Sequence, residues 1–181
     1  MTTASKVTVH MVASLDGYIV DEDGGVSWLD TSDHFEAGVE AEDPTGFLES
    51  IGCWVIGSRT YEQALQLGWP YGDKPTYVLT RRDLAPGPAS VRFRSGDLRR
   101  LVAEELEPHH RNIWVCGGAE LVREFLRADL VDEICVTIAP IVIGAGLPYF
   151  DQIGVKRALH LEEVKAYQNG MVELRYEVLR D

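Results

Sequence analysis

The sequence is poor in cysteine and in positive charge, and each shortage excludes a class of protein. Only 3 cysteines occur, Cys53, Cys116 and Cys135, each beside apolar residues. A disulfide framework or a cysteine-based zinc site is therefore not expected, and the thiols are predicted to be buried and free. The 29 acidic residues outnumber the 17 Lys and Arg, for a net charge of -12. Such a charge repels nucleic acid and anionic membranes, so neither is predicted as a partner.

Long apolar runs are also missing. A membrane span needs about 18 consecutive apolar residues, and the best candidate, residues 136–150, is broken by two Pro and two Gly. Residues 1–6 lack the charged and apolar regions of a secretory signal. We therefore expect a cytoplasmic protein. Its 181 residues, 45% hydrophobic and 25% charged, fit a single folded domain over residues 1–181.

No metal site is predicted, because the five histidines lack ligand spacing. His10 lies in an apolar stretch, and His34, His109, His110 and His160 are spread along the chain with no His-x-His or His-x-x-x-His pattern. The adjacent pair after Pro108 is typical of a solvated helix end. A hydrolase is also disfavoured, because Ser14 and Ser58 lie in no Gly-x-Ser-x-Gly turn.

Apolar stretches alternate with helical patterns over most of the chain. Strands are predicted at 7–13, 53–56, 76–79, 91–93, 113–116 and 134–138, and helices at 31–40, 44–51, 59–66, 97–107 and 121–126. Residues 159–166 and 171–179 read as an antiparallel hairpin around Asn169-Gly170. This order predicts an α/β fold of three layers, α/β/α, with a mostly parallel sheet and a C-terminal antiparallel hairpin.

One predicted strand passes through two glycines directly into a helix. Gly117 and Gly118 follow residues 113–116 and precede Ala119, Glu120 and Leu121. A turn without Cβ atoms lets a ligand approach the backbone, and the free N–H groups at a helix start attract an anion. The pattern is not the G-x-G-x-x-G fingerprint, because Ala119 follows the pair. A tight connection without a ligand is the alternative reading.

Two other turns have the same form and add positive charge. Gly57-Ser58-Arg59-Thr60 leads from a strand into a helix, and Thr80-Arg81-Arg82 ends the next strand. Ligands of open α/β sheets lie beyond the carboxyl ends of the strands, so the three turns can converge on one polyanion. Two adjacent arginines suit an adenosine 2′-phosphate and favour NADPH over NADH. The alternative is that these arginines are solvated surface charges.

Five segments together resemble the dihydrofolate reductase superfamily, and within it the C-terminal reductase domain of riboflavin biosynthesis proteins and its stand-alone bacterial relatives. The segments are residues 14–17, 55–62, 78–81, 115–118 and 139–146. The resemblance covers nearly the whole chain and implies a dihydrofolate reductase-like fold. It also implies NADPH as cofactor, with residues 57–60 and 117–121 along its phosphates and Arg81 near the 2′-phosphate. Thr80 is predicted to be a further cofactor-binding residue. In this family a cis peptide joins the two glycines.

The resemblance also implies a substrate side. Dihydrofolate reductases have a Trp in the first active-site loop and an acid five positions later that promotes protonation of the pterin, a spacing that Trp28 and Asp33 reproduce. Thr137 is similar to the Thr that supports this carboxylate, and Ala13 and Asp16 fall near the substrate. Asp33 and Thr137 are thus the implied catalytic pair. Asp33 can instead be only a helix N-cap, and Asp16 only a turn residue.

Positions at which the sequence departs from the family's motifs narrow the range of possible substrates. Glu49 stands where the riboflavin-pathway domain has an Arg that looks like a substrate-phosphate binder, and residues 33–51 contain no Lys or Arg for a folate tail. We therefore predict an NADPH-dependent reductase that transfers a hydride to a C=N or C=C bond of a small pterin- or pyrimidine-like heterocycle. The alternatives are a riboflavin-pathway 5-amino-6-(5-phosphoribosylamino)uracil reductase and a non-catalytic NADP-binding protein. Analogy and exposed sheet edges predict a homodimer.

Overall fold

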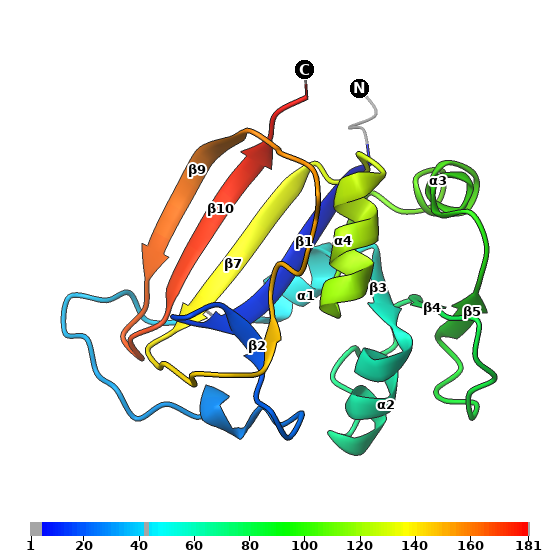
Figure 1. Cartoon of the computed structure of the whole chain (residues 1–181). Helices are drawn as coiled ribbons and strands as arrows, with labels where there is room; N and C mark the ends of the chain where they lie inside the picture. Colours follow the sequence, from blue (N-terminus) through cyan, green and yellow to red (C-terminus); the bar gives the residue numbers. More distant parts are fainter. Residues whose placement is uncertain (1–4, 42–43, 181) are drawn as a thin grey trace.

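An eight-stranded sheet runs through the molecule in the order β5-β4-β3-β6-β1-β7-β10-β9 (Figure 1). The structure is a computed structural model that describes residues 5–41 and 44–180. Most of the strands match the apolar stretches of the sequence. Their bounds are β1 Lys6–Ser14, β3 Cys53–Gly57, β4 Thr76–Leu79, β5 Val91–Arg94, β6 Asn112–Val115, β7 Glu133–Ala139, β9 Leu159–Ala166 and β10 Val172–Val178.

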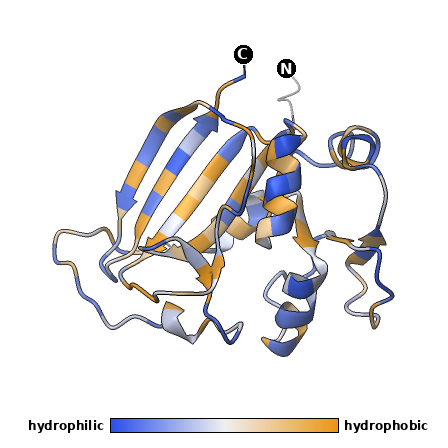
Figure 2. Ribbon diagram, viewed as in Figure 1, coloured by the Kyte–Doolittle hydropathy of each residue, from blue (hydrophilic) through white to orange (hydrophobic). Residues whose placement is uncertain are grey.

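Parallel pairing joins the six strands from β5 to β7, and only β10 runs against its neighbours. The last two strands form the predicted hairpin around Asn169-Gly170, where Gly170 has a φ of +79°. Hydrophilic and hydrophobic residues alternate along β10 (Figure 2), as expected for a strand with two different faces. The predicted mostly parallel sheet with a C-terminal antiparallel hairpin is confirmed.

Helices cover both faces of the sheet, which confirms the predicted three layers. On one face, α4 (Ala119–Arg127) and the continuous helical segment of α3 (Leu98–Leu101) and a π-helical turn, η2 (Val102–Leu106), pack on odd-numbered residues such as Val7, Val9 and Val55. On the other face, Phe47 of α1 (Pro44–Ser50) packs on Trp114, and Tyr61 of α2 (Ser58–Gln66) packs on Ile56.

The helix predicted for residues 31–40 is wrong. This segment, which we call the strap (residues 30–41), is irregular and lies along the turn of the β9–β10 hairpin. The N–H of Phe35 donates to the carbonyl of Gln168 at 2.7 Å, and that of Val39 donates to Ala166 at 2.8 Å. Gly38 touches the hairpin backbone so closely that a Cβ would lie 2.5 Å from the carbonyl carbon of Tyr167. The hairpin thus satisfies backbone groups that a helix would otherwise have satisfied internally.

Two short elements were not predicted. β2 (Tyr18–Val20) and β8 (Leu147–Pro148) form a separate two-stranded sheet, and Trp28 lies in a 3-10 turn, η1 (Ser27–Leu29). No helix among the described residues is long and apolar enough to cross a membrane. Residues 1–4, which form most of the N-terminal stretch used to predict the location, lie outside the described residues. Cys53 and Cys135 are buried free thiols, and Cys116 is half-buried and free.

Candidate functional site

A cleft of about 1620 Å³ lies beyond the carboxyl ends of β4, β3, β6 and β1. The cofactor residues predicted from the sequence meet there. Those that line it are Gly57, Ser58, Arg59, Thr60, Thr80, Arg81, Gly118, Ala119, Glu120 and Leu121. They come from three separate strand ends, and the parallel sheet brings them together because neighbouring carboxyl ends share one edge.

The two glycine turns touch each other at the centre of the cleft. The N–H of Gly57 donates to the carbonyl of Gly117 at 2.9 Å, and a Cβ on Gly57 would lie 3.7 Å from the nitrogen of Gly118. Gly57 and Gly118 are also the N-cap residues of α2 and α4, and neither helix start has a side-chain cap. The first-turn N–H groups of both helices are therefore open to an anion in the cleft. The Gly117-Gly118 peptide bond is cis, as the resemblance implied.

The two adjacent arginines differ in what they bind. Arg82 pairs with Glu62 through both guanidinium NH2 groups, at 2.9 and 2.7 Å, and this bidentate hydrogen bond holds the pKa of Glu62 below its usual value. Arg81 makes no hydrogen bond or ion pair with any described residue, although it lines the same cleft. Of the pair, only Arg81 is available to an anionic ligand.

Sequence reasoning missed a second group of cationic residues at this end. Arg94 ends β5, and Arg99 lies in α3; both line the cleft together with Ser95, Gly96 and Asp97. Arg94 is paired with Glu105 at 2.7 Å, whereas Arg99 has no partner among the described side chains. The signal was present, because Arg94 ends β5 and residues 95–97 follow it, much as Thr80 to Arg82 follow β4. We call the part of the cleft lined by Arg81, Arg94 and Arg99 the cationic end.

The opposite part of the cleft, the aromatic end, is lined by His10, Phe47, Trp54, Tyr71 and Cys116. Trp114 supports it from below: its ring meets the ring of His10 edge-on at 5.3 Å and that of Phe47 at 4.7 Å. Trp54 and Tyr71 lie 5.1 Å apart, between ring centroids. The sequence could not separate these aromatics from ordinary core residues, because both kinds occupy the same apolar strands and helix faces.

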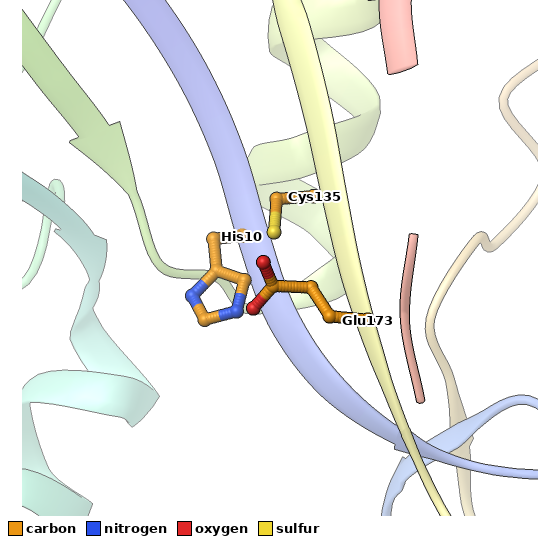
Figure 3. Close-up of side chains that lie close together, drawn as sticks. All are labelled: His10, Cys135 and Glu173. Atoms are coloured by element: carbon orange, nitrogen blue, oxygen red, sulfur yellow. The ribbon is translucent and has the colours of Figure 1, made fainter. Parts of the chain in front are cut away.

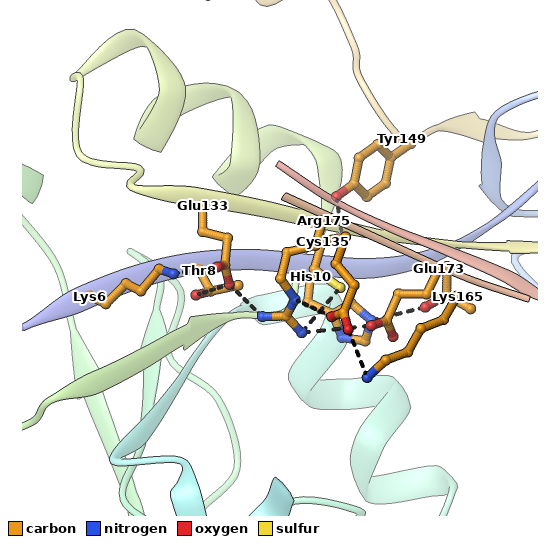
Figure 4. A network of polar contacts seen from close by, with 11 residues as sticks. Lys6, Thr8, His10, Glu133, Cys135, Tyr149, Lys165, Glu173 and Arg175 are labelled. Atoms are coloured by element: carbon orange, nitrogen blue, oxygen red, sulfur yellow. Dashed lines mark hydrogen bonds and ion pairs between the residues drawn. The ribbon is translucent and has the colours of Figure 1, made fainter. Parts of the chain in front are cut away.

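His10 belongs to a polar network on the α1 face of β1, β7 and β10 (Figure 4). The sheet register sets His10 beside Cys135, and Cys135 beside Arg175. Nε2 of His10 is hydrogen-bonded to the hydroxyl of Thr137 at 3.2 Å. Burial, and after it the positive charge of Arg175, lowers the pKa of His10 to about 4, so the imidazole is neutral at pH 7.

Three of these side chains resemble a metal-binding group. Ligand atoms of His10, Cys135 and Glu173 all lie within 4.8 Å of one another (Figure 3). The guanidinium of Arg175 already lies beside two of them, 3.7 Å from the Glu173 carboxylate and 4.0 Å from the Cys135 sulfur. Arg175 supplies the positive charge that a metal would supply, so we interpret the group as part of the polar network.

Residues 5–173 match the model of the RibD C-terminal domain. The chain belongs to the RibD C-terminal domain family. It is 34% identical over 176 residues to YwjB, an uncharacterized protein of Bacillus subtilis (strain 168), covering 94% of this chain and 97% of YwjB. YyaP of the same organism is 25% identical, with 94% of each chain covered. The resemblance found in the five segments is thereby confirmed.

Solved structures with less sequence similarity share the fold. A protein of Shewanella sp. PV-4, whose name associates it with riboflavin biosynthesis, is 24% identical with a TM-score of 0.83, covering 97% of this chain and 99% of that one. The deaminase/5-amino-6-(5-phosphoribosylamino)uracil reductase of Thermotoga maritima is 16% identical with a TM-score of 0.67; the match covers 97% of this chain but 57% of that one. Dihydrofolate reductase from Enterococcus faecalis, complexed with NADP(H), has 15% identity and a TM-score of 0.61, with 97% of each chain covered. The dihydrofolate reductase-like fold is confirmed.

The substrate-side residues suggested for this RibD C-terminal family member do not gather at the cleft. Ala13 packs in the core on the α4 face, and the indole N–H of Trp28 donates to the carbonyl of Gly25 at 3.2 Å. Asp16 accepts hydrogen bonds from the Ser14 hydroxyl at 2.6 Å and the Gly144 N–H at 2.8 Å. The hydrogen bond from the Ser14 hydroxyl and, with a smaller effect, those from the N–H groups of Gly144 and Ile143 lower the pKa of Asp16. This geometry supports the turn reading of Asp16.

The implied catalytic pair is not formed in the described part of the chain. Asp33 is exposed on the strap, not at a helix start, and its carboxylate lies against Gly170 of the hairpin turn. Thr137 is buried in β7, and its hydroxyl is hydrogen-bonded to His10 instead. The irregular path of the strap explains the difference, because the expected helix would have started at this carboxylate. A catalytic role for either residue therefore rests on the family resemblance.

Glu133 is the most buried charge of the polar network, and its replacement provides a test of that network. Its side chain is 2% exposed and contacts Lys6, the Arg175 guanidinium at 2.7 Å and the Thr8 hydroxyl at 3.1 Å. Burial alone would raise the pKa of Glu133, but the hydrogen bond from Lys6 and the charges of Arg175 and Lys6 outweigh it and lower the pKa. Glu133→Gln is expected to destabilise the fold by roughly 1.5 kcal/mol near neutral pH.

The stability lost in Glu133→Gln is expected to depend on pH. A carboxyl whose pKa is lower in the folded state stabilises the fold above its unfolded pKa of about 4.3, and this contribution is lost as the pH falls through the folded value. Urea unfolding of wild type and Glu133→Gln should thus differ at about pH 7 and converge toward about pH 3. Glu163→Gln is the control: it also faces Arg175, at 3.8 Å, but is 44% exposed. Equal losses in the two variants would contradict the role of burial.

Proposed function

We propose that this chain is an NADPH-dependent reductase that transfers a hydride to a C=N or C=C bond of a small pyrimidine- or pterin-like heterocycle. Membership of the RibD C-terminal domain family supports a reductase of the riboflavin pathway type. The observation that supports NADPH as the cofactor is the state of Arg81, which lies at the end of β4 without a partner among the described residues. Its neighbour Arg82 is already paired with Glu62.

The cleft has the parts that such a dinucleotide requires. The adenosine 2′-phosphate would bind Arg81, and the pyrophosphate would lie along the starts of α2 and α4, where Gly57 and Gly118 leave room for it. NADPH supplies the hydride when bound. Three strand spacings, roughly 14 Å in all, separate β4 from β1. With its 2′-phosphate at β4, the extended cofactor would therefore place its nicotinamide ring at the aromatic end. Phe47 and Trp54 line that end and would shield the reacting bond from water once both ligands are bound.

Two alternatives compete with this assignment. A 5-amino-6-(5-phosphoribosylamino)uracil reductase would follow from the family and from the likeness in fold to the Thermotoga maritima enzyme. It requires a cation for the substrate phosphate, and the sequence has Glu49 where that Arg is expected. A non-catalytic NADP-binding protein would use the same cationic end without turnover. The first alternative differs from the main proposal in its preferred substrate, and the second differs in having no turnover.

A titration of the protein with NADPH and with NADH tests the proposal. Quenching of tryptophan fluorescence and the shift in melting temperature report binding. NADPH should bind at least about tenfold more tightly than NADH, a difference of roughly 1.4 kcal/mol. Loss of reduced-nicotinamide absorbance with a panel of pyrimidines and pterins then tests turnover. If neither cofactor binds, the glycine turns are only tight connections and the proposal fails. If NADPH binds but no heterocycle is reduced, the non-catalytic alternative is favoured.

A further inference from the structure

We propose that the aromatic end of the cleft is an uncharged substrate subsite, in which His10 hydrogen-bonds a planar heterocycle that carries no phosphate. The inference rests on the proposed function, because it assigns the substrate class of the same cleft. It differs from the riboflavin-pathway alternative, whose substrate bears a phosphoribosyl group. Three observations support it: the position of the imidazole, the aromatic surfaces around it and the placement of charge.

His10 is held in a defined orientation and has one free hydrogen-bonding atom. Its Nε2 is bonded to the Thr137 hydroxyl, and the ring rests edge-on against Trp114. Nδ1 has no hydrogen-bond partner among the described residues, and the side chain lines the cleft. A neutral imidazole carries one donor and one acceptor nitrogen. Because the Thr137 hydroxyl engages Nε2, Nδ1 is left for a ring N–H or carbonyl of a bound heterocycle.

Aromatic rings around His10 offer flat apolar surface. Phe47, Trp54 and Tyr71 line the same end, and Trp114 links the rings of His10 and Phe47. Phe47 is 39% exposed on α1, although helices of folded proteins usually bury such a ring. A planar heterocycle can therefore stack here while its polar edge meets His10.

Positive charge for a phosphate is lacking at this end. The arginines that line the cleft without a hydrogen bond or ion pair to a described residue are Arg59, Arg81 and Arg99. They lie at the start of α2, at the end of β4 and in α3, whereas His10 is on β1. Arg59 follows β3, two strand spacings or roughly 10 Å from β1. The spacing from β4 to β1 is roughly 14 Å. The cations nearest His10 on the sheet are already paired: Arg175 with Glu133 at 2.7 Å, and Lys165 with Glu163 at 3.4 Å. A phosphate placed at the aromatic end would lose its hydration without gaining a partner.

The titratable groups that line the aromatic end are all uncharged at neutral pH. Burial lowers the pKa of His10 to about 4, and burial raises the pKa of the Cys116 thiol to about 12. Burial also raises the pKa of the Tyr71 phenol. The subsite therefore favours a neutral ligand over an anion, in contrast to the cationic end of the same cleft.

Binding of one base with and without its phosphoribosyl group tests the proposal. The probes are 5,6-diaminouracil and 5-amino-6-(5-phosphoribosylamino)uracil, titrated with and without NADP⁺ and followed by tryptophan fluorescence. We expect 5,6-diaminouracil to bind at least as tightly as the phosphoribosyl compound. His10→Gln should weaken its binding by tenfold or more and leave the affinity for NADPH within twofold. His160→Gln, an exposed histidine of β9, is the matched control and should change neither affinity.

A second variant keeps the test sharp if His10→Gln folds poorly. Phe47→Leu removes a half-exposed ring from α1. It should weaken the binding of 5,6-diaminouracil several-fold without changing the binding of NADPH. Tenfold tighter binding of the phosphoribosyl compound, unchanged affinity in both variants, or no binding of the base by a protein that binds NADPH would each overturn the proposal. If the wild-type protein does not bind NADPH, the proposed function is refuted instead. The titration of 5,6-diaminouracil without cofactor then still tests the subsite.

Discussion

Replacing Gly146 by alanine is expected to cost about 3 kcal/mol of stability and to lower the melting temperature by about 6–12 °C. Gly146 has a φ of +146°, which residues with a Cβ rarely adopt. The added Cβ would overlap the carbonyl oxygen of Val20 and lie 3.1 Å from the Cα of Asp21. These are backbone atoms of the β2 region, so relief requires separation of β2 from β8. Thermal unfolding followed by circular dichroism measures the effect.

Gly144→Ala is the matched control for this prediction. Gly144 lies two residues earlier in the same loop and has a φ of +82°, but a Cβ there would meet nothing within 4 Å. It should cost only the strain of the left-handed conformation, about 1 kcal/mol. Similar melting temperatures for the two variants would show that the contact with Val20 is not the cause.

Replacing Arg81 by glutamine is expected to weaken NADPH binding by about 30-fold, or roughly 2 kcal/mol, and to leave NADH binding unchanged. A guanidinium without a protein partner gives its full charge-assisted hydrogen bonds to a phosphate, and only NADPH carries the 2′-phosphate. Fluorescence titrations of wild type and variant with both nucleotides measure the change. The ratio of the two affinities is the informative quantity, because general damage to the cleft lowers both.

Arg100→Gln controls for the loss of one positive charge. Arg100 is 74% exposed, pairs with Glu104 at 2.9 Å and does not line the cleft. This variant should bind NADPH within about twofold of wild type, because exposed ion pairs contribute little and distant charges are screened. If Arg81→Gln weakens NADPH and NADH equally, Arg81 does not contact the 2′-phosphate and the assignment of the cationic end is wrong.

The glycine turns and Arg81 were predictable because they follow from short-range rules, whereas Arg94 and Arg99 of the cationic end were missed. A β-branched strand such as residues 76–79 is recognisable locally, and its carboxyl end carries Thr80 and Arg81. Parallel pairing brings such ends together, so three turns far apart in sequence could be assigned to one cleft. The difference between Arg81 and Arg82 was not predictable, because it depends on Glu62, 20 residues away on α2.

The substrate side shows the opposite case. Asp33 was expected at a helix start because the spacing from Trp28 matched a known family, but the strap takes its hydrogen bonds from the hairpin at Gln168 and Ala166. Those partners lie more than 120 residues away in the sequence, and no local sequence pattern predicts them. His10 was read as a buried strand residue, and only the lateral order of the strands set it beside Thr137, at one end of the cleft.

The sequence by itself determined the alternation of strands and helices, the C-terminal hairpin, the family and the residues at the carboxyl ends of the strands. These features depend on periodicity, turn chemistry and short motifs, which act over a few residues. Only the tertiary structure decided which arginine is free, where the strap lies and which uncharged side chains meet at the aromatic end. The physical reason is that ion pairing, burial and backbone pairing between distant segments depend on packing, and packing is a property of the whole sheet.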